Sequence, residues 1–207
     1  NVRETIAPIT EQIEVGVKYL KKRYGAEKFI AYFQAFTNTY ADVDTLKVRY
    51  DEALLNKDVI GLSIGTRPDC ITDEILDLIF SYTKKYHVWV EYGIQSIHDR
   101  TLRLVNRGHD YKSFEDAIIR TKNRGGIKIC AHVILGLPGE DRNDMMETAR
   151  TVSAMGIDGI KLHHLYIAKN TAMADDYIKG NIKTLKMEEY VSLACDFLEM
   201  ISPDIVV

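Results

Sequence analysis

The sequence predicts an α/β fold, a partial TIM-like (β/α) barrel of about five parallel strands. Three observations support this expectation: strand-like and helix-like segments alternate, the strands recur at the length of one βαβ unit, and each strand carries polar residues on one face. No linker or low-complexity stretch interrupts the 207 residues, so we expect a single domain over residues 1–207.

The pattern of the first 66 residues predicts a helix, a strand, a second helix and a second strand, in this order. Apolar residues at steps of three and four over residues 5–23 indicate an amphipathic helix, with Pro8 near its start. Residues 28–36 are apolar and aromatic, as in a strand. Residues 42–56 predict the next helix, and residues 58–66 the next strand.

The middle of the chain continues the alternation. Thr72 is a suitable N-cap for a helix with acidic residues in its first turn. Residues 87–96 predict a strand, and residues 99–106 and 113–124 predict two helices. The pair Gly125–Gly126 ends the second of them.

The last part of the chain predicts two further strands. Residues 127–135 and 159–167 are the strands, and residues 143–155 form the helix between them. Two more helices are expected near residues 171–179 and 186–200. The closing Asp-Ile-Val-Val favours the start of another strand.

The spacing of the strands limits the architecture. They begin near residues 28, 58, 87, 127 and 158, and one βαβ unit takes about 30 residues. A complete eight-unit barrel takes about 250 residues, so five strands suit a partial barrel or an open doubly wound sheet. Because the chain opens on a helix, we expect a first strand to be missing upstream.

One face of every predicted strand carries polar residues or glycine, although both faces of a buried parallel strand should be apolar. Residues i and i+2 lie on the same face of a strand. One explanation is that each polar group has its own hydrogen-bonding neighbour. The other is that the polar faces of all five strands point into one shared interior. A shared interior favours a barrel. This interpretation is wrong if the polar side chains point to the outer helices. The positions are Gln34, Ser63, Glu91, Gly93, Gln95, His132, Lys161 and His163.

A polar or glycine-rich turn follows each predicted strand. Ligands of parallel α/β folds bind outside the carboxyl ends of the strands. Glycine allows close backbone approach there, and amides at a helix start hold anionic groups. The turns are Thr37–Thr39, Thr66–Asp69, Gln95–Ser96, Gly136–Glu140 and Lys169–Thr171.

Residues suited to metal or nucleophile chemistry are present without a recognisable motif. His163 and His164 are adjacent on a strand, so they point in opposite directions and do not share one ion. We expect no metal site and leave the catalytic residues unassigned. His132, Lys161 and His163 are open to acid–base work, or Lys161 to Schiff-base chemistry, against a structural role for each.

Composition and charge exclude several classes of protein. Hydrophobic residues make up 46% and charged residues 28%, which is typical of a globular protein. The net charge of −3 gives no support to a strongly basic nucleic-acid platform. No apolar run approaches the roughly 18 residues that span a bilayer, so we expect no membrane partner. Cys70, Cys130 and Cys195 lie far apart, which suits the reducing cytoplasm.

Five segments at the predicted strand ends share their order and residue types with one known family. They are Tyr32–Tyr40, Gly61–Cys70, Val88–Ser96, Val105–Asp110 and Gly136–Asp141. From about residue 28 to the end, the chain resembles the radical S-adenosylmethionine (SAM) superfamily, above all its elongator-like bacterial subfamily of Fe–S oxidoreductases. That family folds as a partial (β/α)6 barrel, in agreement with the shared polar interior.

The resemblance implies that SAM binds at the carboxyl ends of the strands. Thr37, Asn38 and Thr39 stand where the family holds the methionine amino group through the backbone. Arg107 corresponds to the arginine that pairs with the methionine carboxylate, for which a guanidinium fork is suited. The other implied contacts are Glu91 and Gln95 to ribose and methionine, Ile134 and Gly136 to the adenine face, and Tyr166, Ile167 and Lys169 to the adenine edge.

The sequence departs from the family pattern in two places. Gly65 stands where several relatives have Glu, and Arg67 is our candidate for the lost contact. The larger departure is the absence of Cys-x3-Cys-x2-Cys, whose thiolates bind a [4Fe–4S] cluster in the family. The three cysteines do not have that spacing. We therefore expect a fragment that lacks the cluster loop and is inactive alone.

The resemblance also implies an activity for the intact protein. With SAM and a [4Fe–4S] cluster it would generate a 5′-deoxyadenosyl radical that acts on an unidentified substrate. A flavodoxin or ferredoxin is the implied electron donor, and the elongator-like pattern suggests tRNA or a nucleobase as substrate. Two alternatives remain: a cluster-free barrel that serves as a binding or scaffold module, and a barrel lyase that uses Lys161.

Overall fold

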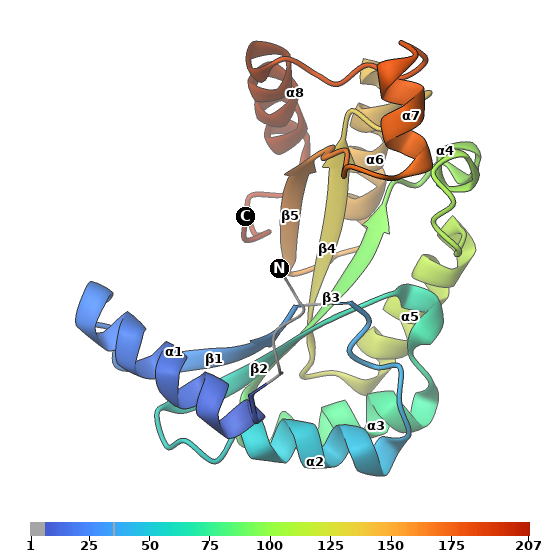
Figure 1. Ribbon diagram of the computed structural model, residues 1–207. Coiled ribbons are helices and arrows are strands. Elements are labelled where there is room, and N and C mark those ends of the chain that lie inside the picture. The colour runs from blue at the N-terminus through green and yellow to red at the C-terminus, as the bar shows by residue number, and fades with distance from the viewer. Residues whose placement is uncertain (1–6, 35) are drawn as a thin grey trace. The chain divides into compact units, whose positions relative to one another are not determined.

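Strands and helices alternate along the chain, as the hydrophobic pattern predicts (Figure 1). The computed structural model describes residues 7–34 and 36–207. Its five strands follow the order β1-β2-β3-β4-β5, so each strand pairs with the one before it in sequence. A (β/α) barrel has this order, whereas the order of a doubly wound sheet reverses at a switch point. The predicted α/β fold with five parallel strands is confirmed.

The elements occupy most of the described chain. The strands are β1 (Phe29–Phe33), β2 (Val59–Thr66), β3 (His87–Gln95), β4 (Lys128–Leu135) and β5 (Gly159–His164). The helices are α1 (Ile9–Tyr24), α2 (Val43–Ala53), α3 (Asp73–Tyr82), α4 (Asp99–Leu104), α5 (Tyr111–Arg124), α6 (Arg142–Ala154), α7 (Ala172–Ile178) and α8 (Met187–Met200). Among the described residues, no helix combines the length and the apolar character needed to cross a bilayer.

The chain divides into two compact units. The first contains residues 1–66, 70–90 and 120–127, and the second contains residues 67–69, 91–119 and 128–207. The division passes through β3 between Val90 and Glu91. The expectation of one domain over the whole chain stays a prediction.

The first unit is built around the parallel pair β1 and β2 and the helices α1, α2 and α3. Tyr50 of α2 is fully buried, and its ring makes edge contacts with Phe33 and Tyr82 at 5.3 and 6.3 Å between centroids. Its hydroxyl donates to the carbonyl of Asn38 at 2.8 Å. This tyrosine therefore links the apolar core of the unit to the loop that follows β1.

The second unit is built around the parallel pair β4 and β5. One face of its part of β3 is apolar, and Tyr92 there meets the ring of Phe114 on α5 at 6.3 Å. Helices α6 and α8 pack against each other, and Phe197 of α8 is fully buried. The predicted closing strand is reduced to a single parallel bridge between Val206 and Gly159.

Two strands end earlier than the sequence pattern predicts. The strand expected over 28–36 stops at Phe33, because the Asn38 side chain donates to the Phe33 carbonyl and Phe36 has a φ of 65°. Ala35 lies outside the described residues. The strand expected over 159–167 stops at His164. The first helix begins at Ile9, after Pro8, and the predicted residues 5 and 6 lie outside the described part.

We expect Asp141→Ala to lower the free energy of unfolding by about 1 kcal/mol. The Asp141 carboxylate accepts from the amides of Asn143 and Asp144, and the Asp144 carboxylate accepts from the amide of Asp141 in return. The substitution leaves the first-turn amides of α6 without this acceptor. Urea unfolding followed by circular dichroism measures the loss.

The control is Asp141→Asn, which keeps a side-chain oxygen at the N-cap and is expected to stay close to the wild type. Equal stability of the alanine variant and the wild type would contradict the assigned role of this cap.

Candidate functional site

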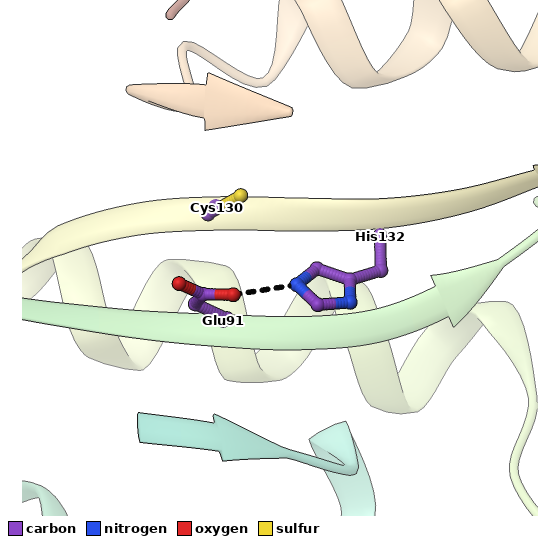
Figure 2. A group of neighbouring side chains, drawn as sticks. All are labelled: Glu91, Cys130 and His132. Atoms are coloured by element: carbon purple, nitrogen blue, oxygen red, sulfur yellow. Dashed lines mark hydrogen bonds and ion pairs between the residues drawn. The ribbon is translucent and has the colours of Figure 1, made fainter. Parts of the chain in front are cut away.

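A buried carboxylate is shared by two basic side chains on neighbouring strands of the second unit. Glu91 Oε2 on β3 accepts from Nε2 of His132 on β4 at 2.7 Å and from Nζ of Lys161 on β5 at 2.5 Å. Figure 2 shows the Glu91 carboxylate pointing to the His132 ring. The Glu91 side chain is only 7% exposed. A charge at this depth needs such partners, because its desolvation is otherwise costly.

His163 extends this group along β5. Its Nε2 lies 3.4 Å from Nδ1 of His132, and the two ring centroids are 5.1 Å apart. In the parallel register His132 pairs with Lys161 and Ile134 with His163. We call Glu91, His132, Lys161 and His163 the Glu91 cluster.

Burial lowers the pKa of His163, and the neighbouring His132 and Lys161 lower it further, while Glu91 acts in the opposite direction. The prediction that polar residues of these strands face one another is confirmed for the Glu91 cluster. Gln34 and Ser63 belong to the first unit and are not part of this group.

A second group of nitrogen donors lies where β3 ends. The carbonyl of Gly93 accepts from Nη2 of Arg107 at 2.8 Å and lies 3.1 Å from Nε2 of His109. A Cβ atom added to Gly93 would lie 2.6 Å from both Arg107 Nη2 and Gln95 Nε2. Only glycine therefore leaves space for the guanidinium and the carboxamide to converge here. We call Gly93, Gln95, Arg107 and His109 the Gly93 group.

The predicted residues Gln95 and Arg107 are thus brought together, whereas His109 was missed by the sequence reasoning. Its place two residues after Arg107 in Val-Asn-Arg-Gly-His was the available signal. Burial lowers the pKa of His109, and the adjacent Arg107 lowers it further, against hydrogen bonds to the carbonyls of Asp110 and Gly93. A neutral imidazole beside a guanidinium adds a donor without adding a second positive charge.

Arg67 is held in place by its own neighbours. Its Nε and Nη2 donate to the Asp69 carboxylate at 2.9 and 2.6 Å, and Nη2 also donates to the carbonyl of Gly108 at 3.0 Å. Gly108 has a φ of 82°, and a Cβ there would come within 3.1 Å of the guanidinium. Arg67 thus supports the loop that carries Arg107 and His109.

The predicted residues Thr37, Asn38 and Thr39 lie in the first unit, on a loop tied down by side chains. Asn38 Nδ2 donates to the carbonyls of Phe33 and Gly65 at 2.9 and 3.0 Å. The Thr39 hydroxyl, which is buried, lies 2.6 Å from that of Thr66 and donates to the carbonyl of Cys70 at 2.5 Å. The side chains of Asn38 and Thr39 therefore shape the loop, and the contact of its backbone with the methionine amino group stays a prediction.

The remaining predicted residues belong to the ends of β4 and β5. Ile134 is half-buried, and Gly136 has a φ of 84° with the side chain of Leu185 close above it. Tyr166 is 84% exposed, and Lys169 is exposed as well. The structure leaves the predicted adenine contacts of these residues as predictions.

Two groups of side chains in the described part have the spacing of metal ligands, and neither is assigned as a metal site. Ligand atoms of Glu91, Cys130 and His132 lie within 4.8 Å of one another. The Glu91 carboxylate already holds the Lys161 ammonium, a cation supplied by the chain. In the group of His98, Asp144 and Glu147, Asp144 pairs with Arg100 and accepts from the amide of Asp141, the N-cap of α6.

The chain's cysteines do not fit an iron–sulfur cluster. Cys70 is half-buried, Cys130 is buried and Cys195 is exposed. Each of the two possible ligand groups found among the described residues contains at most one cysteine. A [4Fe–4S] cluster takes several thiolates from closely placed cysteines.

The sequence matches two protein-family models. Residues 3–152 match the model of the radical SAM superfamily, which covers more than half of the sequence. The chain belongs to the radical SAM superfamily. Residues 157–207 match the model of the radical SAM C-terminal domain.

Curated relatives match most of the chain. An uncharacterized protein of Methanocaldococcus jannaschii, MJ0486, is 45% identical over 97% of this chain and 62% of its own length. Uncharacterized protein YtqA of Bacillus subtilis is 44% identical over 87% of this chain and 56% of its own. The chain thus spans less than two thirds of the length of these curated relatives.

Solved structures share the fold. The archaeal Elp3 of Methanocaldococcus infernus superposes with a TM-score of 0.81 at 19% identity, over 96% of this chain and 51% of the other. The radical SAM enzyme coproporphyrinogen III oxidase of Escherichia coli gives a TM-score of 0.62 at 16% identity, over 95% and 47% of the two chains.

We expect iodoacetamide at pH 8 to label Cys195 and to leave Cys130 unlabelled in the folded protein. Burial raises the pKa of the Cys130 thiol to about 12, so on the order of one molecule in ten thousand carries the reactive thiolate at this pH. Cys195 is the exposed internal control. Peptide mass spectrometry measures both, and labelling of Cys130 at the rate of Cys195 would contradict the burial of this strand face.

Proposed function

We propose that this chain is the SAM-binding core of a radical SAM enzyme. The observation that carries the proposal is the Gly93 group, where three nitrogen-bearing side chains converge on one glycine at the carboxyl end of a parallel strand. Parallel α/β folds bind their ligands at this end. A guanidinium and neutral donors suit a ligand that has both a carboxylate and hydroxyl groups, as SAM does.

The residues proposed to hold SAM have distinct roles. Arg107 binds the methionine carboxylate, while Gln95 and Glu91 take ribose and amino-acid atoms. Thr37–Thr39 meets the amino group through its backbone, and Arg67 supports the Arg107 loop. Ile134 and Gly136 pack on adenine, and Tyr166, Ile167 and Lys169 contact its edge through the backbone. The bound cofactor supplies the adenosyl group, and the protein supplies its binding and orientation.

We propose that the [4Fe–4S] cluster of the whole protein is held by cysteines that this sequence does not contain. The support is the chemistry of the three cysteines that are present, which are far apart in sequence and differ in exposure. The chain is then unable to cleave SAM alone, and the whole protein takes electrons from a flavodoxin- or ferredoxin-like donor.

We propose tRNA as the substrate class of the whole protein. A tRNA-2-methylthio-N(6)-dimethylallyladenosine synthase of Fusobacterium nucleatum is 23% identical over 95% of this chain and 47% of its own length. Human Elongator complex protein 3 is 29% identical over 75% of this chain. With a net charge of −3, this chain would contact RNA through a local patch.

We expect Arg107→Ala to weaken the binding of SAM to this chain by about ten- to a hundredfold. Loss of a charge-assisted hydrogen bond to a carboxylate costs about 1.5–3 kcal/mol. Isothermal titration calorimetry measures the dissociation constant, and circular dichroism checks that the variant is folded.

The matched control is Arg103→Ala, which removes an exposed guanidinium from the nearby helix α4. Its affinity should equal that of the wild type. Unchanged affinity of the Arg107 variant would remove Arg107 from the cofactor site.

We expect anaerobic reconstitution of the 207-residue chain with iron and sulfide to yield no [4Fe–4S] cluster. The whole protein under the same conditions should take up about four irons and four sulfides and release 5′-deoxyadenosine from SAM after reduction. Iron and sulfide analysis with chromatography of the nucleoside provides the measurement. Cluster assembly on the short chain would refute the assignment of the cluster to other cysteines.

A further inference from the structure

The Glu91 cluster runs along the strands toward their carboxyl ends. Glu91 lies four residues before the end of β3, and Lys161 lies three residues before the end of β5. His163 lies one residue before that end, which places it about 7 Å nearer the ligand side than Lys161. The cluster thus leads from a buried carboxylate to a partly exposed imidazole.

We propose that Glu91, His132 and His163 form a proton relay in which His163 exchanges a proton with the substrate. This inference rests on the proposed function and adds a catalytic acid–base group to it. Its substrate is a molecule with an acidic N–H or O–H group that the reaction must deprotonate. In the relay, Glu91, His132 and Lys161 are positioning residues, because they act through His163; the SAM contact proposed above for Glu91 is a separate role.

The hydrogen bonds determine where the protons lie. An ionised carboxylate only accepts, so the His132 nitrogen that faces Glu91, Nε2, carries a proton. Neutral His132 then presents a lone pair on Nδ1, to which His163 Nε2–H can donate across 3.4 Å. This tautomer leaves the lone pair of His163 on Nδ1, as a proton acceptor for the substrate.

The transfer balances without any co-reactant. His163 Nδ1 takes the proton, the electron pair of the broken N–H or O–H bond stays on the substrate, and His163 becomes an imidazolium. It can pass its Nε2 proton to His132 Nδ1, which places the positive charge beside the Glu91 carboxylate. The reverse sequence returns the proton to the product.

The surroundings of His163 favour the neutral base at rest. Tyr190 of α8 packs against the ring of the adjacent His164. The charged and titratable groups that act on His163 are His132 on β4, Lys161 on β5 and Glu91 on β3. Burial and the first two of these groups lower the pKa of His163. A general base must be unprotonated at the working pH, and this environment meets that condition.

Lys161 supplies the positive charge that balances the Glu91 carboxylate. Its ammonium lies 2.5 Å from Glu91 Oε2. Removing this ammonium should draw a proton onto His163. Removing the carboxylate charge should have the opposite effect.

The first test is NMR titration of the imidazole carbons in the whole protein. We expect Lys161→Met to raise the pKa of His163, and Glu91→Gln to lower it, by about half a pH unit or more in each case. His163→Gln identifies the signal, and the signal of the adjacent His164 serves as the internal reference. A pKa of His163 that is equal in the wild type and both variants would overturn the relay.

The second test uses the reconstituted whole protein with SAM, a reductant and unfractionated tRNA from cells that lack the gene. We expect His163→Gln to lower formation of modified tRNA by at least about a hundredfold, and His164→Gln to change it less than about twofold. In the wild type, the rate should fall as the pH drops through the pKa of His163, since protonation removes the base.

The titration and the activity assay together distinguish failure of the proton relay from failure of the proposed function. Wild-type protein that releases no 5′-deoxyadenosine would refute the proposed function, while the titration still decides the relay. Active wild-type protein with an equally active His163→Gln variant would overturn the role of His163 alone.

Discussion

The second unit depends on one buried negative charge. Glu91 stands on a strand whose opposite face packs Tyr92 and Ile94 into the core, so its carboxylate is removed from water by the same fold that buries those side chains. An unpaired carboxylate at that depth would take up a proton or destabilise the fold. The partners come from β4 and β5, which ties three strands together through one oxygen atom.

The same constraint has a chemical consequence. A carboxylate that holds one histidine and one lysine fixes the tautomer of the histidine, and the histidine in turn orients the next ring. Polar residues of a strand face are therefore not independent of one another. The pairing that balances the buried charge also determines which nitrogen atoms carry protons. Acid–base chemistry requires protons at defined atoms.

Close backbone approach is the second constraint, and it acts at the strand ends. At Gly93, a side chain would occupy the space in which Arg107 and Gln95 lie. Gly108 makes similar room for the guanidinium of Arg67. Glycine at these positions lets long polar side chains fold back on the main chain, and this gathers donors at the carboxyl end of β3.

The sequence by itself determined the order of elements, the parallel α/β class and the face on which Glu91, His132, Lys161 and His163 lie. Hydrophobic periodicity and the period of two along a strand are local properties, so they can be read without a structure. The early end of β1 was not readable, because it depends on Asn38 bonding to Phe33 and Gly65. Only the tertiary structure decided that one carboxylate serves two bases, and that His109 joins Arg107 at Gly93. These contacts join residues far apart in the chain, and their distances follow from strand pairing and loop packing rather than from any local pattern.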